Sequence, residues 1–119
     1  MSENMQEKSF EICDRCLVIH GKYDMDHHNA MKIRTDADRM IDNGNIKYVI
    51  FDFSGVDFMD SSGIGLIMGR YKKVIFTGGK CLVCNVGENV DRIFRMSGIY
   101  KIIPKCGSVD EAVMEAERK

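Results

Sequence analysis

Two serines follow an aspartate at residues 58–63, Phe-Met-Asp-Ser-Ser-Gly, directly before apolar residues at helical spacing. The first turn of a helix has unpaired N–H groups and a partial positive charge, so it favours an anion. A phosphoserine, with roughly −1.5 to −2 charges and three acceptor oxygens, would be well placed there. Aspartate and serine also cap helices without any further role. The residues alone leave both interpretations open, a capping motif and a modifiable hydroxyl, and the two are compatible.

The residues around the serines suit contact with another protein. Gly63 and Gly65 have no side chains and would let a partner approach the helix backbone. Phe58 and Met59 are expected to form an apolar surface beside the serines. Arg70 is predicted on the polar side of the helix, where it would contact either a partner or solvent.

Five cysteines are present, and two pairs have the C-x-x-C spacing of zinc and redox sites. Cys81 and Cys84 lie in a predicted strand, where positions i and i+3 point to opposite faces and cannot readily share a metal. Cys13 and Cys16 flank a predicted turn and could lie close together, but no second pair of ligands accompanies them. The polar, acidic N-terminus does not resemble an export signal, so we expect free, buried thiols. No metal and no cofactor is predicted, and a redox role for the first pair stays an alternative.

Two further polar groups have a chemical alternative. His27 and His28 adjoin an aspartate, but neighbours on a helix point about 100° apart, and no third metal ligand is evident. Asp52 ends a buried strand, as the phosphoacceptor of response regulators does, but the acidic pair and the lysine of such a site are not evident. Without a nucleophile–base pair, a metal cluster or a Walker-type loop, we predict no catalytic residue and no enzyme activity.

The chain has 119 residues, of which 45% are apolar and 29% are charged, and its net charge is −1. These values are typical of one soluble domain. No basic tail or arginine stripe is present, so nucleic acid is not an expected partner. The apolar runs are far shorter than the roughly 20 residues of a membrane span. We therefore expect a cytoplasmic protein without membrane contact.

Apolar periodicity and turn residues predict strands and helices in alternation. The predicted strands are 9–13, 16–20, 48–53 and 81–86, with a short edge segment at 99–103, and the predicted helices are 27–42, about 60–77, 87–97 and 108–118. The order β-β-α-β-α-β-α-(β)-α, with crossover connections after the first hairpin, predicts an α/β domain. Its sheet would be mixed but mostly parallel, with four to five strands and about four helices.

Residues 58–65, Phe-Met-Asp-Ser-Ser-Gly-Ile-Gly, and the following Gly-Arg-Tyr-Lys at 69–72 closely resemble the STAS domain family. Within this family the sequence is most similar to bacterial anti-sigma factor antagonists, above all those of sporulation. Further matching segments are 26–30, 78–79, 83–84, 92–98 and 101–103. The resemblance covers about residues 10–103 and implies that residues 1–119 form a single STAS domain, with a polar tail at about 1–7.

The resemblance implies a partner-switching phosphoprotein that regulates transcription in sporulation or a stress response. Its unphosphorylated form would bind an anti-sigma factor with serine kinase activity and so release a sigma factor. The kinase would phosphorylate the first serine after the aspartate, here Ser61, and a serine phosphatase would restore binding. The implied partner-binding residues are Asp24, Asp26, Asp60, Ser61, Ser62, Gly63, Ile64, Gly65 and Arg70.

The loop before the first predicted helix departs from the family pattern, in which Gly-x-x-Asp runs directly into the helix. This loop is longer, so Asp24 matches by its distance from Gly21, and Asp26 matches by the two histidines that follow it. Two other functions stay open as hypotheses. The glycines at the serine-bearing helix start, and the nucleotide binding of some STAS domains, suggest a nucleotide-binding module. The shared fold also allows an accessory unit of a transporter or a signalling scaffold.

Overall fold

The computed structural model describes residues 9–118. Its strands are β1 (Phe10–Cys13), β2 (Cys16–His20), β3 (Tyr48–Asp52), β4 (Lys80–Cys84) and β5 (Lys105–Cys106). Its helices are α2 (His27–Asn43), α3 (Ser61–Ile75), α4 (Glu88–Ser97) and α5 (Val109–Glu117), with a short 3-10 helix, η1 (Ile99–Lys101). The polar tail predicted at about residues 1–7 lies outside the described residues.

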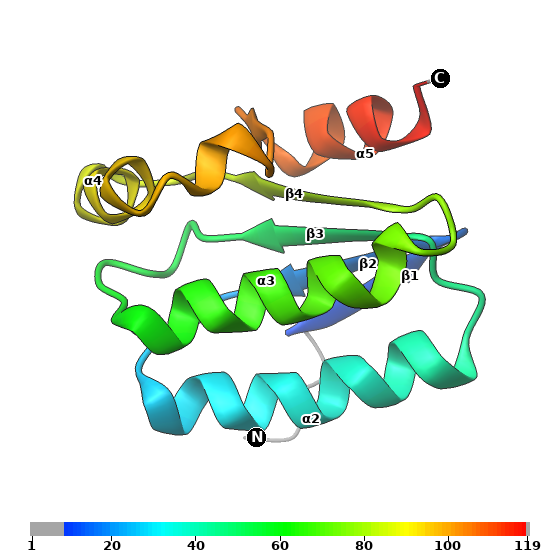
Figure 1. The fold of residues 1–119 in the computed structure, drawn as a ribbon, viewed down its shortest axis with the longest axis horizontal. Helices are drawn as coiled ribbons and strands as arrows, with labels where there is room; N and C mark the ends of the chain where they lie inside the picture. Colours follow the sequence, from blue (N-terminus) through cyan, green and yellow to red (C-terminus); the bar gives the residue numbers. More distant parts are fainter. Residues whose placement is uncertain (1–8, 119) are drawn as a thin grey trace.

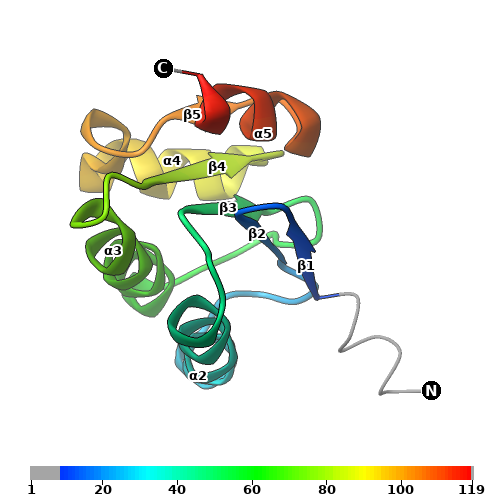
Figure 2. The ribbon, with the colours of Figure 1, turned by 90° about the vertical axis from the view of Figure 1, so that its right-hand side faces the viewer.

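The five strands form one sheet in which their spatial order follows the chain (Figures 1 and 2). β1 is antiparallel to β2, and every later pair of neighbouring strands is parallel. The predicted α/β fold with a mixed, mostly parallel sheet is therefore confirmed. Parallel neighbours need crossover connections, and the helices between the strands supply them.

Figure 2 shows helices on both sides of the sheet, so each strand contributes side chains to two cores. On the side of α2 and α3, Val49 and Phe51 belong to the larger buried cluster. On the opposite side, Ile50 packs with Ala112 and Ala116 of α5. Successive side chains of a strand point to opposite faces, so both sides of β3 are buried. This explains its nearly continuous run of apolar residues.

The edge of the sheet beyond β4 differs from the prediction, in which residues 99–103 formed the edge strand. The chain makes the 3-10 helix η1 there, and pairing with β4 begins only at Lys105. Gly98, in the left-handed conformation with φ of 77°, ends α4 and turns the chain. Ile99 and Ile103 are both buried and lie four residues apart, a spacing that a helical turn places on one side.

Phe94 lies in an aromatic cluster and should be the most costly side chain of α4 to remove. It is fully buried, and its ring meets those of Phe53 and Tyr100 edge-on at centroid distances of 5.5 and 5.6 Å. In urea denaturation, Phe94→Ala is expected to lower the free energy of unfolding by about 3–5 kcal/mol. Met96→Ala, on the same helix at a residue that is 82% exposed, is the control and should change it by less than about 0.5 kcal/mol. Equal losses in the two variants would contradict the packing of Phe94.

Candidate functional site

The loops that follow β2 and β3 run side by side beyond the end of the sheet. Met25 N–H donates to the Phe58 carbonyl at 2.8 Å, and the Met25 carbonyl accepts from Asp60 N–H at 3.2 Å. These bonds form a parallel bridge between Met25 and Met59. The two loops, which are far apart in the sequence, thus pair again beyond β2 and β3 at an isolated bridge. This pairing brings the first turns of α2 and α3 together (Figure 1).

Both helices begin with the same arrangement, a buried methionine followed by a capping aspartate. Met25 and Met59 are each 1% exposed. The next residue, Asp26, accepts a hydrogen bond from a backbone N–H in the first turn of α2 at 2.9 Å. Asp60 does the same for α3 at 2.8 Å. The aspartates satisfy otherwise unpaired N–H groups and place a negative charge at the positive end of each helix.

Asp24 and Asp26, the two candidates for the aspartate of the longer loop, have different roles. Asp26 uses its carboxylate as the cap of α2. Asp24 contributes its backbone carbonyl, which accepts from Asn29 Nδ2 at 2.8 Å. The Asp24 carboxylate is exposed and makes no hydrogen bond or ion pair within residues 9–118. It is therefore the carboxylate of this loop that a partner can reach.

The two serines at the start of α3 differ in exposure and in contacts. Ser61 is the first helical residue, it is exposed, and its hydroxyl makes no hydrogen bond to any described residue. Ser62 is half-buried, and its Oγ lies 3.4 Å from Nδ1 of His27 in the first turn of α2. Because Asp60 supplies the cap, neither serine hydroxyl is used for capping.

The two glycines near the serines have different surroundings. A Cβ at Gly63 would lie 2.8 Å from Met59 Sδ and 3.1 Å from Met25 Cγ, so the open space expected there is absent. Gly63 instead lets the start of α3 pack on the bridge between the loops. At Gly65 a Cβ would meet nothing within 4 Å, so this residue does leave the helix backbone accessible. Ile64, between the two, is half-buried and packs against the main core.

Two other expectations for this surface are wrong. Met59 is buried beneath the helix start, so Phe58, which is 52% exposed, provides the apolar surface beside the serines without it. Arg70 is not on a polar face, because it is only 5% exposed. Its Nε lies 2.9 Å from Asp38 Oδ1, and this ion pair joins α3 to α2. Charged side chains are rarely buried unless they are paired. The sequence pattern of α3 predicted an exposed Arg70 because the pattern gives no sign of a partner on α2.

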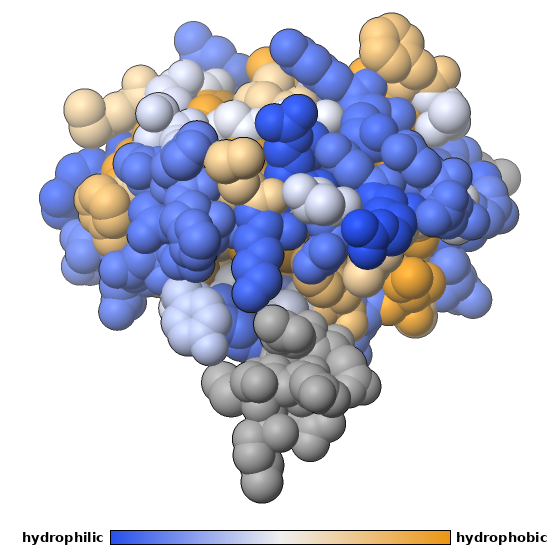
Figure 3. Space-filling view, turned by 90° about the horizontal axis from the view of Figure 1, so that it is seen from below, coloured by the Kyte–Doolittle hydropathy of each residue, from blue (hydrophilic) through white to orange (hydrophobic). Residues whose placement is uncertain are grey.

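A groove of about 370 Å³ lies between α2 and α3 and reaches the helix starts. Met31 and Arg34 line it from α2, and Gly65 and Gly69 line it from α3. We call the groove together with the exposed residues of the two helix starts, Asp24, Phe58 and Ser61, the helix-start surface. Figure 3 shows the lower side of the molecule, where hydrophilic side chains predominate and apolar side chains form small groups among them.

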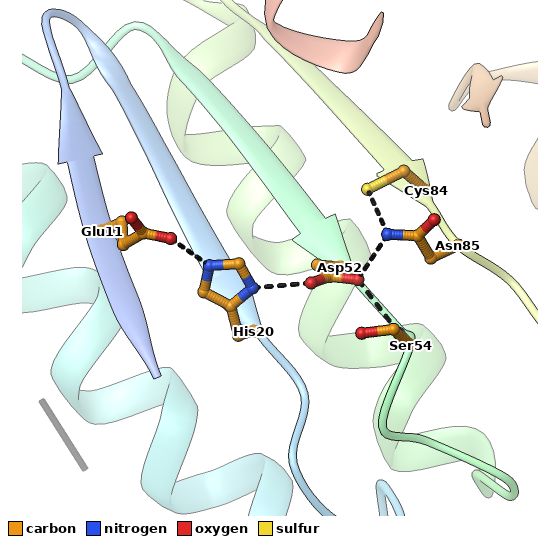
Figure 4. Close-up of polar contacts among 6 residues, drawn as sticks. All are labelled: Glu11, His20, Asp52, Ser54, Cys84 and Asn85. Atoms are coloured by element: carbon orange, nitrogen blue, oxygen red, sulfur yellow. Dashed lines mark hydrogen bonds and ion pairs between the residues drawn. The ribbon is translucent and has the colours of Figure 1, made fainter. Parts of the chain in front are cut away.

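A chain of polar side chains crosses the sheet where the paired loops begin (Figure 4). Oδ2 of Asp52, at the end of β3, lies 2.6 Å from His20 Nδ1 at the end of β2. Oδ1 of Asp52 accepts from Asn85 Nδ2 at 2.9 Å and from Ser54 N–H at 3.0 Å. Nε2 of His20 contacts Glu11 of β1. These contacts tie four neighbouring strands together at the carboxyl end of the sheet.

The surroundings of Asp52 favour its ionised form. Burial, to 7% exposure, raises the pKa of its carboxyl, but the hydrogen bonds from Asn85, His20 and Ser54 outweigh burial and hold the pKa below its usual value. Both carboxylate oxygens are occupied by donors from the protein. This arrangement stabilises the carboxyl ends of the central strands. It offers no support for Asp52 as a phosphoacceptor.

Sequence reasoning missed this chain of contacts, although a signal was present. His20, Asp52 and Asn85 are polar residues at or just after the ends of three strands that are otherwise apolar. The carboxyl ends of parallel strands meet at one edge of a sheet, so such residues become neighbours.

The two cysteines of the second C-x-x-C pair do not converge. Cys81 and Cys84 belong to the cores on opposite faces of the sheet, as predicted. Across residues 9–118, no three His, Cys, Asp or Glu side chains are arranged to hold a metal ion. In the same part of the chain, no helix has both the length and the apolar composition to cross a membrane.

A family model for the STAS domain matches residues 7–112, which include the paired loops and both helix starts. The chain belongs to the STAS domain family. An anti-sigma F factor antagonist of Paenibacillus polymyxa is 35% identical to it over 101 residues, which are 85% of this chain and 86% of that protein.

Solved structures of an anti-sigma factor antagonist are similar to this STAS domain. Unphosphorylated SpoIIAA superposes with a TM-score of 0.80 and 29% identity, over 89% of this chain and 92% of SpoIIAA. Phosphorylated SpoIIAA, a Bacillus cell fate determinant, superposes with a TM-score of 0.71 and 28% identity, over 89% and 96% of the two chains.

Asp52→Asn should destabilise this STAS domain in a pH-dependent way. The ionised carboxylate stabilises the fold above its unfolded-state pKa, near about 4, and this contribution disappears as the pH falls through the lowered folded-state pKa. At pH 7 the variant is expected to lose about 1–3 kcal/mol of unfolding free energy. The difference from wild type should shrink as the pH falls below about 4, because Asp52 is protonated first in the unfolded state and only at lower pH in the folded state.

The measurement is urea denaturation of both proteins between pH 7 and pH 3. Asp57→Asn is the matched control, because Asp57 is exposed in the loop that follows β3, and it should change stability by less than about 0.5 kcal/mol. A loss in Asp52→Asn that stays constant over this pH range would contradict the stabilising role of the charge.

Proposed function

We propose that this STAS domain protein is an anti-sigma factor antagonist that acts by binding and carries out no catalysis. Its unphosphorylated form binds an anti-sigma factor with serine kinase activity and so releases a sigma factor. The observation that carries the proposal is the exposed hydroxyl of Ser61 at the first position of α3, beside the start of α2. The relatives named as anti-sigma factor antagonists support the same function.

Ser61 is the residue that the kinase modifies. A kinase must reach the hydroxyl oxygen, and Ser61 is exposed and makes no hydrogen bond to a described residue. Ser62 is a poorer acceptor because its side chain is half-buried and lies against His27. The phosphate would stand at the positive end of α3, where unpaired N–H groups favour it.

Phosphorylation would change the charge of the helix-start surface much more than its shape. Asp24, Asp26 and Asp60 already place three carboxylates around the two helix starts. A phosphate adds roughly −1.5 to −2 charges, and burying it against a partner is unfavourable unless it is paired there. A partner that presents carboxylates, or the phosphates of a bound nucleotide, would be repelled.

The switch needs no refolding of the domain. The Asp26 and Asp60 caps and the Met25–Met59 bridge involve no atom of the Ser61 side chain. These contacts can therefore persist in the phosphorylated protein. The similarity of this chain to SpoIIAA in both its unphosphorylated and its phosphorylated form is consistent with such a switch.

The residues assigned to partner binding divide into contacting and positioning residues. Direct contacts are assigned to Asp24, Ser61 and Gly65, with Phe58 and Met31 as exposed apolar neighbours. Positioning roles are assigned to Asp26, Asp60, Ser62, Gly63, Ile64 and Arg70, which cap, pack or join the two helices. The direct contacts combine a carboxylate, an apolar ring and an accessible helix backbone, which suits a specific protein partner.

The complete cycle also requires a serine phosphatase that restores the Ser61 hydroxyl. We place the cycle in the bacterial cytoplasm, where it would regulate transcription in sporulation or a stress response.

Incubation with the cognate kinase and ATP tests the assignment of Ser61. Wild type and Ser62→Ala should each gain one phosphate, and peptide mapping should locate it at residue 61. Ser61→Ala should gain none, because the accessible hydroxyl is gone. Phosphate at another residue, or undiminished transfer to Ser61→Ala, would refute the assignment.

Binding measurements on charge variants test the switching mechanism. Ser61→Ala should retain its affinity for the anti-sigma factor, since it keeps the neutral helix start. Ser61→Asp should bind at least about tenfold more weakly, a loss of about 1.4 kcal/mol. Equal affinity of the two variants, measured by isothermal titration calorimetry on proteins of equal stability, would exclude charge as the switching mechanism.

A further inference from the structure

The turn of the β1–β2 hairpin places two cysteines opposite each other. Cys13 ends β1 and Cys16 begins β2, and the two are direct partners in the antiparallel register. Only Asp14 and Arg15 separate them, and Asp14, with φ of 55°, adopts the left-handed conformation in this tight turn.

The hydrogen-bond pattern of the hairpin defines how far apart the two cysteines are. His20 N–H donates to the Ser9 carbonyl at 2.8 Å, so these residues form a hydrogen-bonded pair. Such pairs alternate with non-hydrogen-bonded pairs along an antiparallel ladder, so Cys13 and Cys16 are also a hydrogen-bonded pair. The Cα atoms of such a pair lie about 5.5 Å apart, a distance common in disulfides. The Cβ atoms of directly opposite residues lie about 4.5–5.5 Å apart, so the hairpin turn must tighten by about 1 Å to reach the Cβ separation of about 3.5–4.5 Å found in disulfides.

The side chains of the two cysteines also project in the same direction. Residues paired across two strands leave the sheet on the same face. Cys16 lies in the buried cluster beneath α5, which identifies this face. The Cys13 thiol is on the same face, next to the hairpin turn, where it is exposed.

Cys13 is the only exposed cysteine of the five. Cys16, Cys81 and Cys84 are buried, and Cys106 is half-buried. An oxidant in solution therefore reaches Cys13 first. The cysteine held directly opposite Cys13 is Cys16, so the hairpin supplies both an accessible thiol and a neighbour that can react with it.

We propose that Cys13 and Cys16 form a reversible intramolecular disulfide when the protein meets a peroxide. The Cys13 thiolate attacks one peroxide oxygen, the O–O bond breaks, and the leaving hydroxide takes up a proton, which gives a sulfenic acid and one water. The Cys16 sulfur then attacks the Cys13 sulfur, the S–O bond breaks, and the leaving hydroxide takes the Cys16 proton as a second water. Two thiols are oxidised by two electrons in total, and one peroxide is reduced. A dithiol reductant reverses the reaction by thiol–disulfide exchange.

The second step should depend on pH. Burial, together with the negative charges of Glu117, Cys13 and Asp14, raises the pKa of the Cys16 thiol to about 11. Proximity therefore has to compensate for a small thiolate fraction near neutral pH. The disulfide should form faster at pH 8.5 than at pH 7.

The disulfide is independent of the proposed anti-sigma function. β2 runs from Cys16 to His20, and the loop that leads to the helix-start surface follows His20. The hairpin turn therefore lies at the opposite end of the sheet from Ser61. Oxidation should leave phosphorylation of Ser61 unchanged, so failure of either proposal does not affect the other.

Trypsin digestion reads out the disulfide directly, because Lys8, Arg15 and Lys22 are cleavage sites on either side of each cysteine. The folded protein is treated with hydrogen peroxide, alkylated with iodoacetamide, digested and analysed by mass spectrometry. We expect peptides 9–15 and 16–22 joined by a disulfide, or an uncut peptide 9–22 lighter by two hydrogens. Reduction with dithiothreitol should restore two separate peptides with free thiols.

The Cys81 and Cys84 pair is a matched internal control with the same C-x-x-C spacing. Its side chains lie on opposite faces of β4, so this pair should remain reduced in the folded protein. A Cys16→Ser variant should lose the intramolecular link while keeping Cys13 reactive toward iodoacetamide. Unlinked Cys13 and Cys16 after the peroxide is consumed would overturn the proposal. Equal linkage of both C-x-x-C pairs in the folded protein, or Cys13 joined to a second chain, would also overturn it.

Discussion

The backbone bridge between Met25 and Met59 is the contact on which the helix-start surface depends. β2 and β3 end in register at His20 and Asp52, the loop after β3 is longer by two residues, and hydrogen-bonded pairing resumes at the bridge. A capping aspartate follows immediately in each loop, so the bridge sets the relative position of the two helix N-termini. The bridge thereby determines where the positive ends of α2 and α3 lie, and hence where Ser61 lies.

The contacts around the loops leave this arrangement little freedom. A Cβ at Gly21 would lie 2.4 Å from Val56 Cγ2, and a Cβ at Gly55 would lie 2.5 Å from the Gly21 carbonyl oxygen, so the loops touch where both residues are glycine. The hydrogen-bonded Asp52 ties the strand ends below them. Such support suits the proposed switch by charge, in which the partner would meet the same backbone shape before and after phosphorylation of Ser61. The buried ion pair of Arg70 with Asp38 joins the two helices farther along.

Local signals in the sequence predicted most of the fold, whereas contacts between distant segments could not be predicted. Helix periods, caps and the buried run of β3 are local, and the proposal of Ser61 as the phosphorylation site came from the resemblance to a family. The pair Met-Asp occurs at 25–26 and at 59–60, but this repeat has a meaning only once the two loops are known to pair. Arg70 was predicted on a polar face, because the helical pattern alone does not reveal its ion pair with Asp38 of α2. The apolar segment 99–103 suits a strand by composition, but burial of Ile99 and Ile103 on one side favours a helical turn.

The central claim is that the whole helix-start surface, and not Ser61 alone, binds the anti-sigma factor. Gly65→Leu tests it most directly, because a Cβ there meets open space and replacing a glycine inside a helix raises helix propensity by up to about 1 kcal/mol. We predict that the variant is at least as stable as wild type in urea denaturation. Its affinity for the anti-sigma factor should nevertheless fall by at least about tenfold in isothermal titration calorimetry, equivalent to about 1.4 kcal/mol. Unchanged affinity in the folded variant would contradict the claim.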